Sequence, residues 1–334
     1  MILSENKKLR TGIIGLGCRG NSMTALLAER DDLEITAVCD VYDDRVAAMQ
    51  EKLAQRGLPR PVGFVDFTRL IDSPLTDIIF VFSAWENHVP AAVHAMRAGK
   101  PVAFEVGGAY SIEDCRLLVD TYLDTHIPVM MLENCMYGSR EMTVTEMARA
   151  GVFGEIMHLD GGYMHDLRSE VANGGKNRHY RLRNYLSRCC ENYPTHELGP
   201  ICRLLGINED NLSVYTDETN SEADHFKWRG FWGNYDEWAK KYQPALWREY
   251  TASGVKKGHG GMDFLVLDAF ITSIKEGIPT PVDVFDAAVM MAVTPLSALS
   301  ISRGGEPVDF PDFLTGVSPE DISRCTGKYA LHRI

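Results

Sequence analysis

A glycine-rich turn near the N-terminus constrains the fold of this chain more than any other feature. The sequence TGIIGLGCRGN sets Gly15, Gly17 and Gly20 in the spacing GxGxxG, directly after an apolar run and before a helical pattern. In such a unit the glycines permit the tight turn, the approach of a pyrophosphate and the packing of helix on strand. The helix N-terminus then faces the phosphates. The unit predicts a dinucleotide site that includes Cys18 and Arg19, with a simple strand-closing turn as the alternative.

An acidic residue follows at the distance that a dinucleotide site requires. Asp40 ends the second apolar run, about twenty residues after Gly20, where a carboxylate can bind the ribose hydroxyls. A carboxylate also repels a 2′-phosphate and so favours NAD over NADP, although Tyr42 and Arg45 follow closely. The sequence therefore predicts NAD as the cofactor.

The chain divides into two regions with different patterns of apolar and amphipathic stretches. Residues 10–132 alternate short β-branched runs with amphipathic stretches, which is typical of a doubly wound parallel sheet. We therefore expect an α/β protein whose residues 1–132 form an NAD-binding Rossmann domain. Residues 133–334 are predicted to form a substrate-binding and catalytic α+β domain with a large open sheet. Within it, residues 154–166 alternate like a long strand, and the aromatic segment 226–243 is expected to form a loop or short helix over the site.

Composition and charge limit the classes of function. The formal charge of −12 argues against nucleic acid or an anionic membrane as the main partner. No uncharged apolar run approaches the ~20 residues of a membrane span, and the N-terminus lacks the pattern of an export signal. The eight cysteines show no CxxC pair and no zinc spacing. We expect a cytoplasmic protein with reduced thiols and no metal site.

Polar residues follow two further strands at the carboxyl edge of the predicted sheet, where ligands bind in such folds. Asn87 and His88 come after the run DIIFVFS and open the next helix, and Glu105 ends the run PVAFEV. All three are predicted to lie at the cofactor site. For His88 a helix-start residue that touches only cofactor or solvent is favoured, and for Glu105 a structural hydrogen bond is an equal alternative.

Several longer stretches resemble one protein family. They are GLGCRGNS, FEVGGAYSIEDC, MMLENCMYG, GVFGEIMHLDGGYMHDLR, RNYLSRCCENYPTHELGPICRLLGIN and GHGGMDF. Over nearly the whole chain the arrangement resembles the Gfo/Idh/MocA oxidoreductases. Within that group it is most similar to the NAD-dependent hydrolases of glycoside hydrolase family 109, the alpha-N-acetylgalactosaminidase-like branch.

The departures from the wider group are informative. Its dehydrogenases carry an EKP lysine that helps to polarise the reacting hydroxyl, and this chain reads EVG from Glu105 onward. Their Asp-xxx-His pair becomes Asn192 and His196 here. Loss of the lysine and retention of the string YPTH resemble the hydrolase branch, whereas Asn192 and Glu197 differ from it.

The resemblance implies a set of catalytic residues in the second domain. Tyr193 and His196 belong to the YPTH string, and a histidine can take up a hydroxyl proton and return it near neutral pH. Tyr163 and His165 stand two apart on one predicted strand, so their side chains share a face and can form an acid/base pair. Glu133 is predicted to orient His165 or a substrate hydroxyl, with a structural salt bridge as the alternative.

Two further stretches supply substrate candidates. The loop Lys176–Arg188 holds five cations, which form either a solvated lid face or a contact to the cofactor pyrophosphate or an acidic sugar. Arg181 is the substrate candidate in this loop. The string GHGGMDF supplies His259 and Asp263, which lie at a helix start beside glycines that let a ligand approach the backbone.

The leading hypothesis is a glycosidase that uses NAD⁺ catalytically. It oxidises C3 of the sugar, eliminates the aglycone, adds water and reduces C3 again. The alternatives are an NAD-dependent sugar or cyclitol dehydrogenase that releases NADH and, less favoured because the catalytic candidates are retained, a dinucleotide-binding sensor. We expect a small sugar or glycoside as the partner and a homo-oligomer, a dimer or tetramer, formed through the open sheet face.

Overall fold

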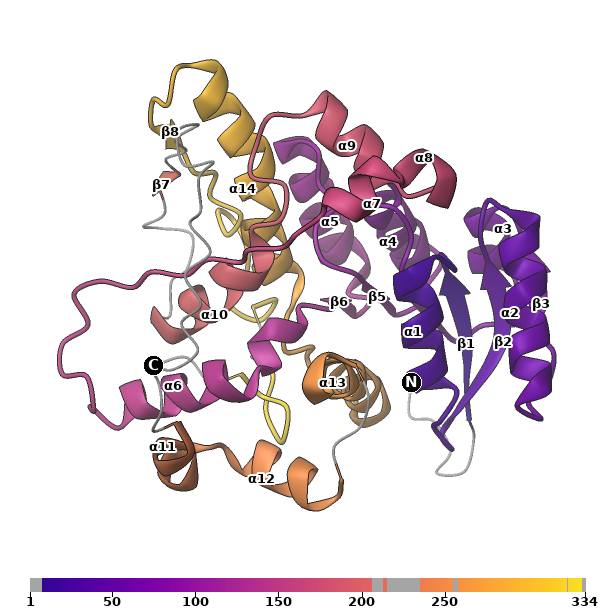
Figure 1. Ribbon diagram of the computed structural model, residues 1–334, viewed down its shortest axis with the longest axis horizontal. Helices are drawn as coiled ribbons and strands as arrows, with labels where there is room; N and C mark the ends of the chain where they lie inside the picture. The colour runs from indigo at the N-terminus through magenta and orange to yellow at the C-terminus, as the bar shows by residue number, and fades with distance from the viewer. Residues whose placement is uncertain (1–7, 206–212, 215–234, 255–257, 323, 332–334) are drawn as a thin grey trace.

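The first half of the protein is a six-stranded parallel sheet with the order β3-β2-β1-β4-β5-β6 (Figure 1). The computed structural model describes residues 8–205, 213–214, 235–254, 258–322 and 324–331. The strands are β1 (Leu9–Ile14), β2 (Leu33–Cys39), β3 (Val62–Phe64), β4 (Ile78–Val81), β5 (Val102–Phe104) and β6 (Val129–Met131). This order is that of a dinucleotide-binding doubly wound sheet, so the predicted N-terminal fold is confirmed.

Helices cover both faces of the sheet, which explains why its central strands read as continuous apolar runs. They are α1 (Cys18–Leu27), α2 (Asp43–Gln55), α3 (Phe67–Asp72), α4 (His88–Arg97) and α5 (Ile112–Thr125), with the short 3-10 turn η1 (Trp85–Asn87) before α4. Every residue of β4, β5 and β6 is buried. The carboxyl ends of the parallel strands meet at one edge, where the site forms.

The second half is mainly helical in the described residues. Its elements are η2 (Asn134–Tyr137), α6 (Ser139–Arg149), α7 (Arg168–Ala172), α8 (Gly174–Asn177), α9 (Arg181–Ser187), α10 (Thr195–Leu205), β7 (Ser213–Val214), α11 (Tyr235–Tyr242), α12 (Ala245–Ala252), η4 (His259–Gly261), α13 (Met262–Glu276), α14 (Val284–Ser302) and β8 (Val308–Asp309). Of the aromatic segment 226–243, residues 235–242 form α11, which packs on α6, and residues 226–234 lie outside the described residues.

The longest helix, α14, joins the two halves. By length and composition it could cross a membrane, with a mean hydropathy of 1.7 over its apolar window, but 72% of that window is buried inside the molecule. The helix packs against α5 and β6 of the first domain and α10 of the second. Its apolar character therefore fits a core helix.

The large open sheet predicted for the second domain is not found in the described part of the chain. There β7 and β8 form a two-stranded antiparallel ladder of two residues each. Residues 154–166 form neither helix nor strand, and Met157 and Met164 are 83% and 72% exposed. An alternating pattern does not make a strand unless neighbouring strands pair with its backbone groups. The face predicted for oligomerisation is thus missing from the described residues as well.

Candidate active site

The turn between β1 and α1 has the shape of a phosphate cradle. Gly15 has a φ of +90°, and a Cβ there would lie 2.4 Å from the backbone nitrogen of Ser83. A Cβ on Gly20 would lie 1.9 Å from the carbonyl oxygen of Gly15, so α1 can pack on the turn only because residue 20 has no side chain. Beside Gly17 a Cβ would meet only Arg45, at 3.7 Å. No side chain caps the first N–H groups of α1. These features fit a bound pyrophosphate.

Asp40 lies directly after β2 and supports this turn. Its buried carboxylate accepts a hydrogen bond from the backbone N–H of Leu16 at 2.8 Å and one from Tyr42 at 3.1 Å. Arg45 Nη1 lies 3.5 Å from the same group. Each carboxylate oxygen has further lone pairs for a ribose diol. The side chain therefore combines a structural contact with an available acceptor.

Replacing Asp40 with asparagine is expected to narrow the preference for NAD over NADP, because a neutral amide no longer repels a 2′-phosphate. Asp40→Ala should also weaken NAD binding itself, since the N–H of Leu16 loses its acceptor. Calorimetric titration of each variant with both cofactors measures this, with Glu51→Gln on the exposed side of α2 as the matched control. Equal affinity of the unaltered protein for NAD and NADP would contradict the assignment.

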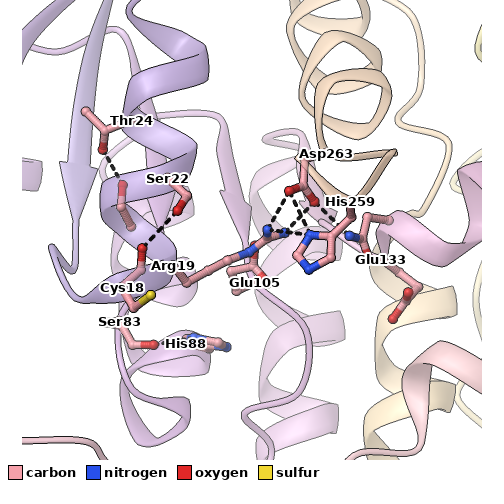
Figure 2. A network of polar contacts seen from close by, with 12 residues as sticks. Cys18, Arg19, Ser22, Thr24, Ser83, His88, Glu105, Glu133, His259 and Asp263 are labelled. Carbon is pink, nitrogen blue, oxygen red and sulfur yellow. Dashed lines mark hydrogen bonds and ion pairs between the residues drawn. The ribbon is translucent and has the colours of Figure 1, made fainter. Parts of the chain in front are cut away.

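Arg19 connects this turn to the second domain, as Figure 2 shows. Its Nε donates to Glu105 at 2.7 Å, and its Nη1 and Nη2 donate to the two oxygens of Asp263 at 2.7 and 2.9 Å. Asp263 also accepts from Asn134 at 2.7 Å, and His259 Nδ1 lies 2.9 Å from it. Burial alone would raise the pKa of the Asp263 carboxyl, but the contacts with His259 and Arg19 hold that pKa well below its usual range.

A cavity of about 330 Å³ opens beside this bridge, between the carboxyl edge of the sheet and the second domain. Its volume lies within the usual range of ligand pockets. It brings together most residues that the sequence predicts for cofactor and substrate. These are Cys18, Arg19, His88, Glu105, Tyr163, His165, Arg181, Tyr193, His196, His259 and Asp263. Six predicted site residues do not line the cavity: Gly15, Gly17, Gly20, Asp40, Asn87 and Glu133. Glu133 lies behind His196.

Two tyrosine rings flank His196, the second residue of α10. The rings of Tyr163 and Tyr193 each meet the imidazole edge-on with centroids 4.7 Å apart. The hydroxyl of Tyr163 lies 3.5 Å from Nδ1 of His165. Burial raises the pKa of both tyrosine hydroxyls, so each keeps its proton near neutral pH and can donate it in a hydrogen bond.

The partner of Glu133 is His196, whereas the sequence pointed to His165 or a substrate hydroxyl. Oε1 of the fully buried Glu133 lies 2.6 Å from Nδ1 of His196. Glu133 begins η2, and α10 packs closely on η2 at Gly199, where a Cβ would lie 3.3 Å from the Glu133 side chain. The carboxylate holds the ring in place through Nδ1 and leaves Nε2 for a substrate.

His88 has a structural role in addition to lining the cavity. Its two ring nitrogens lie 3.0 Å from the backbone carbonyl oxygens of Ser83 and Gly107. Burial lowers the pKa of this imidazole, which favours the neutral ring. The contacts tie the turn after β4 to the turn after β5, so the expectation that His88 touches only cofactor or solvent is wrong. Asn87 precedes His88 at the end of η1.

Three of the five cations of the Lys176–Arg188 loop, Lys176, Arg178 and Arg183, are exposed, which agrees with the predicted solvated face. Four of the five also contact protein groups. The contacts are Arg178–Asp44 at 2.7 Å, Arg181–Glu170 at 2.7 Å, Arg183–Glu86, and Arg188 over the ring of Tyr110. Arg181 nevertheless lines the cavity, and its buried Nε has no partner among the described residues. It stays a candidate for a substrate oxygen.

Four aromatic residues of the cavity were not predicted from the sequence: Phe82, Trp85, His179 and Tyr180. The ring of Trp85 lies 5.1 Å from that of Tyr180 and 5.8 Å from that of Tyr193. Trp85 comes soon after β4, so its position at the carboxyl edge of the sheet could have identified it as a site residue. Tyr180 lies between two short helices, and no pattern in the sequence distinguishes it.

Two family models match the chain. Residues 9–132 match the oxidoreductase family with an NAD-binding Rossmann fold. Residues 137–229 and 214–318 match the C-terminal domain of glycosyl hydrolase 109. The two pieces of the second match overlap at residues 214–229.

Individual relatives agree with these matches. The chain is 30% identical to an alpha-N-acetylgalactosaminidase of Tannerella forsythia, over 92% of this chain and 86% of that protein. It is 30% identical to a glycosyl hydrolase family 109 protein of Solibacter usitatus, over 93% and 89%. These alignments extend over 405 and 391 residues, more than the 334 of this chain, so the relatives contain internal segments that it lacks.

A solved structure supports the fold alone. The myo-inositol 2-dehydrogenase of Lactobacillus plantarum superimposes with a TM-score of 0.53 at 17% identity, over 63% of this chain and 59% of that chain. The likeness covers the sheet-and-helix architecture and carries no statement about substrate.

Proposed function

Because this chain belongs to glycosyl hydrolase family 109 and its N-terminal region to the Gfo/Idh/MocA oxidoreductases, we propose that it is an NAD-dependent glycosidase. The carrying observation is a cavity lined both by Cys18 and Arg19, which lie between the motif glycines, and by His196, the partner of Glu133. The name of the Tannerella relative makes alpha-linked N-acetylgalactosamine the first substrate class to test.

The proposed roles follow from the contacts in the cavity. The glycine turn and Asp40 would hold the cofactor, which when bound accepts a hydride from C3 of the sugar and returns it at the end of the cycle. His196 takes the C3 hydroxyl proton through Nε2, and Glu133 orients the ring through its contact with Nδ1. Tyr163 is the second proton-transfer group, and His165 beside it can exchange that proton. This chemistry differs from that of glycosidases with two carboxylates.

The alternative of a dehydrogenase that releases NADH has less support. Dehydrogenases of the wider group carry a lysine where this chain has Val106, a buried apolar residue just after Glu105. Glu105 itself is paired with Arg19. No cation therefore follows β5 to polarise a reacting hydroxyl, and His196 is left as the group that takes its proton.

Hydrolysis in D₂O is expected to place deuterium at C2 of the released sugar, while C3 keeps its original hydrogen. The C2 proton is acidic while C3 is a ketone, and solvent supplies its replacement when water adds to the enone. The hydride at C3 returns from the same bound cofactor. Proton NMR of the sugar released from a nitrophenyl alpha-N-acetylgalactosaminide measures both positions.

The same spectrum distinguishes the competing chemistries. A dehydrogenase would give a keto sugar and free NADH. A two-carboxylate glycosidase would hydrolyse the substrate and leave C2 fully protonated. That last result would refute the proposed mechanism even with NAD bound.

A further inference from the structure

Three potential metal ligands meet behind the substrate cavity, although the cysteine spacing predicts no metal site. A carboxylate oxygen of Glu133, Sγ of Cys135 and a ring nitrogen of His196 all lie within 4.8 Å of one another. We call these three residues the Glu–Cys–His cluster. Sequence spacing could not reveal it, since His196 is 63 residues from Glu133 and belongs to a different helix.

The local fold holds the cluster together. Oε1 of Glu133 accepts the backbone N–H of Cys135 at 3.0 Å, which fixes the first turn of η2 and keeps the thiol beside the carboxylate. The packing of α10 on η2 then brings His196 against Glu133 from the other side. In Figure 2 the Glu133 carboxylate points away from the Arg19–Asp263 bridge.

One oxygen of the cluster lacks compensation among the described residues. Glu133 is 0% exposed, and its Oε2 is buried with no hydrogen-bond partner there. A buried carboxylate oxygen without a partner is costly, and a bound cation is one of the few groups that can satisfy it.

We propose that the Glu–Cys–His cluster is a binding site for a zinc-type divalent cation, and that its occupation switches off His196 as a base. One sulfur, one nitrogen and one oxygen ligand form a set that suits Zn²⁺ and leaves its fourth tetrahedral position open. Binding releases the Cys135 proton to solvent, because the ligand is the thiolate. Calcium and magnesium, which require several oxygen ligands, are excluded by this set.

The switching effect follows from the ring nitrogen that the cation uses. His196 contacts Glu133 through Nδ1, so a cation in the cluster replaces the hydrogen bond on that nitrogen. The neutral ring then carries its proton on Nε2, the nitrogen that would take the substrate hydroxyl proton. It can donate a hydrogen bond there but cannot accept a proton. Substrate binding is retained, so the cation is expected to lower kcat and leave KM nearly unchanged. This second part rests on the proposed glycosidase function.

Cobalt(II) provides a readout that does not depend on activity. NAD⁺-loaded protein, first dialysed against a chelator, is titrated with CoCl₂ and followed by near-ultraviolet absorption and equilibrium dialysis. One bound cobalt per chain with a thiolate-to-cobalt charge-transfer band is expected, and ZnCl₂ should displace it. Cys135→Ser should abolish the band and weaken binding at least ~10-fold, since even outer contacts of metal ligands change affinity by that much.

Cys189→Ser, which alters an exposed thiol outside the cluster, is the matched control and should keep both band and affinity. Absence of a bound cobalt, cobalt without the band, or a band that survives in Cys135→Ser would overturn the site. Zinc inhibition is measured separately. If the glycosidase proposal fails, the cobalt titration still decides the site. If cobalt binds as expected but zinc leaves kcat unchanged, the switch is wrong and the site stands.

Discussion

Replacing His196 with alanine is expected to lower glycosidase turnover by at least ~10²-fold, the usual scale for a lost general acid or base. The imidazole lies in the cavity between two tyrosine rings, and Glu133 holds its Nδ1 at 2.6 Å. NAD binding should stay near the value of the unaltered protein, because the glycine turn belongs to the other domain. Steady-state kinetics and a calorimetric NAD titration measure the two effects.

Two further variants test whether the loss of turnover is specific to the site residues. Tyr163→Phe removes only a hydroxyl and is expected to reduce turnover on the same scale. His94 of α4 is a partly exposed histidine paired with Asp72 at the end of α3. His94→Ala should leave kcat within a factor of about two of the unaltered protein. Near-normal turnover in His196→Ala would return that residue to a structural role at the start of α10.

Asp263→Ala is expected to lower the free energy of unfolding by about 2–3 kcal/mol. Removing one partner of a buried ion pair costs about 3–5 kcal/mol because the other charge stays behind. The estimate is reduced here because the Arg19 side chain is 27% exposed and keeps Glu105 as a partner. Asn134 and His259 lose a hydrogen-bond partner as well. Denaturant titration of the apoprotein measures the change.

The pH dependence provides an independent check. The folded protein holds the pKa of the Asp263 carboxyl below its value in the unfolded chain. Its stabilisation is therefore present above the unfolded pKa and is lost as the pH falls toward the folded pKa. Asp263→Ala should flatten the acid side of the stability profile. Glu146→Ala, which breaks an exposed pair with Arg149, should change stability by less than about 0.5 kcal/mol. Equal losses in both variants would contradict a buried bridge.

The sheet could be predicted because a short stretch of adjacent residues is enough to identify each strand. The runs that form β4, β5 and β6 are apolar on both faces, and those of β1 and β2 are mostly apolar, so one short window identifies each strand. The glycine turn was predictable for the same reason, since φ at Gly15 and the close approach at Gly20 are properties of adjacent residues. The short edge strand β3 gives a weaker signal, because its residues are partly exposed.

The second domain resisted prediction because its contacts are made between distant residues. The alternation in 154–166 has the period of a strand, but a strand also depends on neighbours that no window contains. Glu133 contacts His196 instead of the predicted His165, because α10 packs on η2 with Gly199, far along the chain, at the close approach. The Arg19–Asp263 bridge spans 244 positions, and the sequence identified both residues without indicating that they meet.

The segment that carries Tyr163 has a consequence for motion. Residues 154–166 have no strand ladder, and Tyr163 is 42% exposed, so one wall of the cavity is held mainly by ring contacts with Tyr193 and His196. Segments with few buried contacts open at low free energy, well before the protein unfolds. A ligand that fills the cavity restricts the motion of this wall when it binds. The conformational entropy lost in the wall weakens the affinity for the ligand. Side-chain changes that stiffen the wall would therefore tighten binding without adding any contact to the ligand.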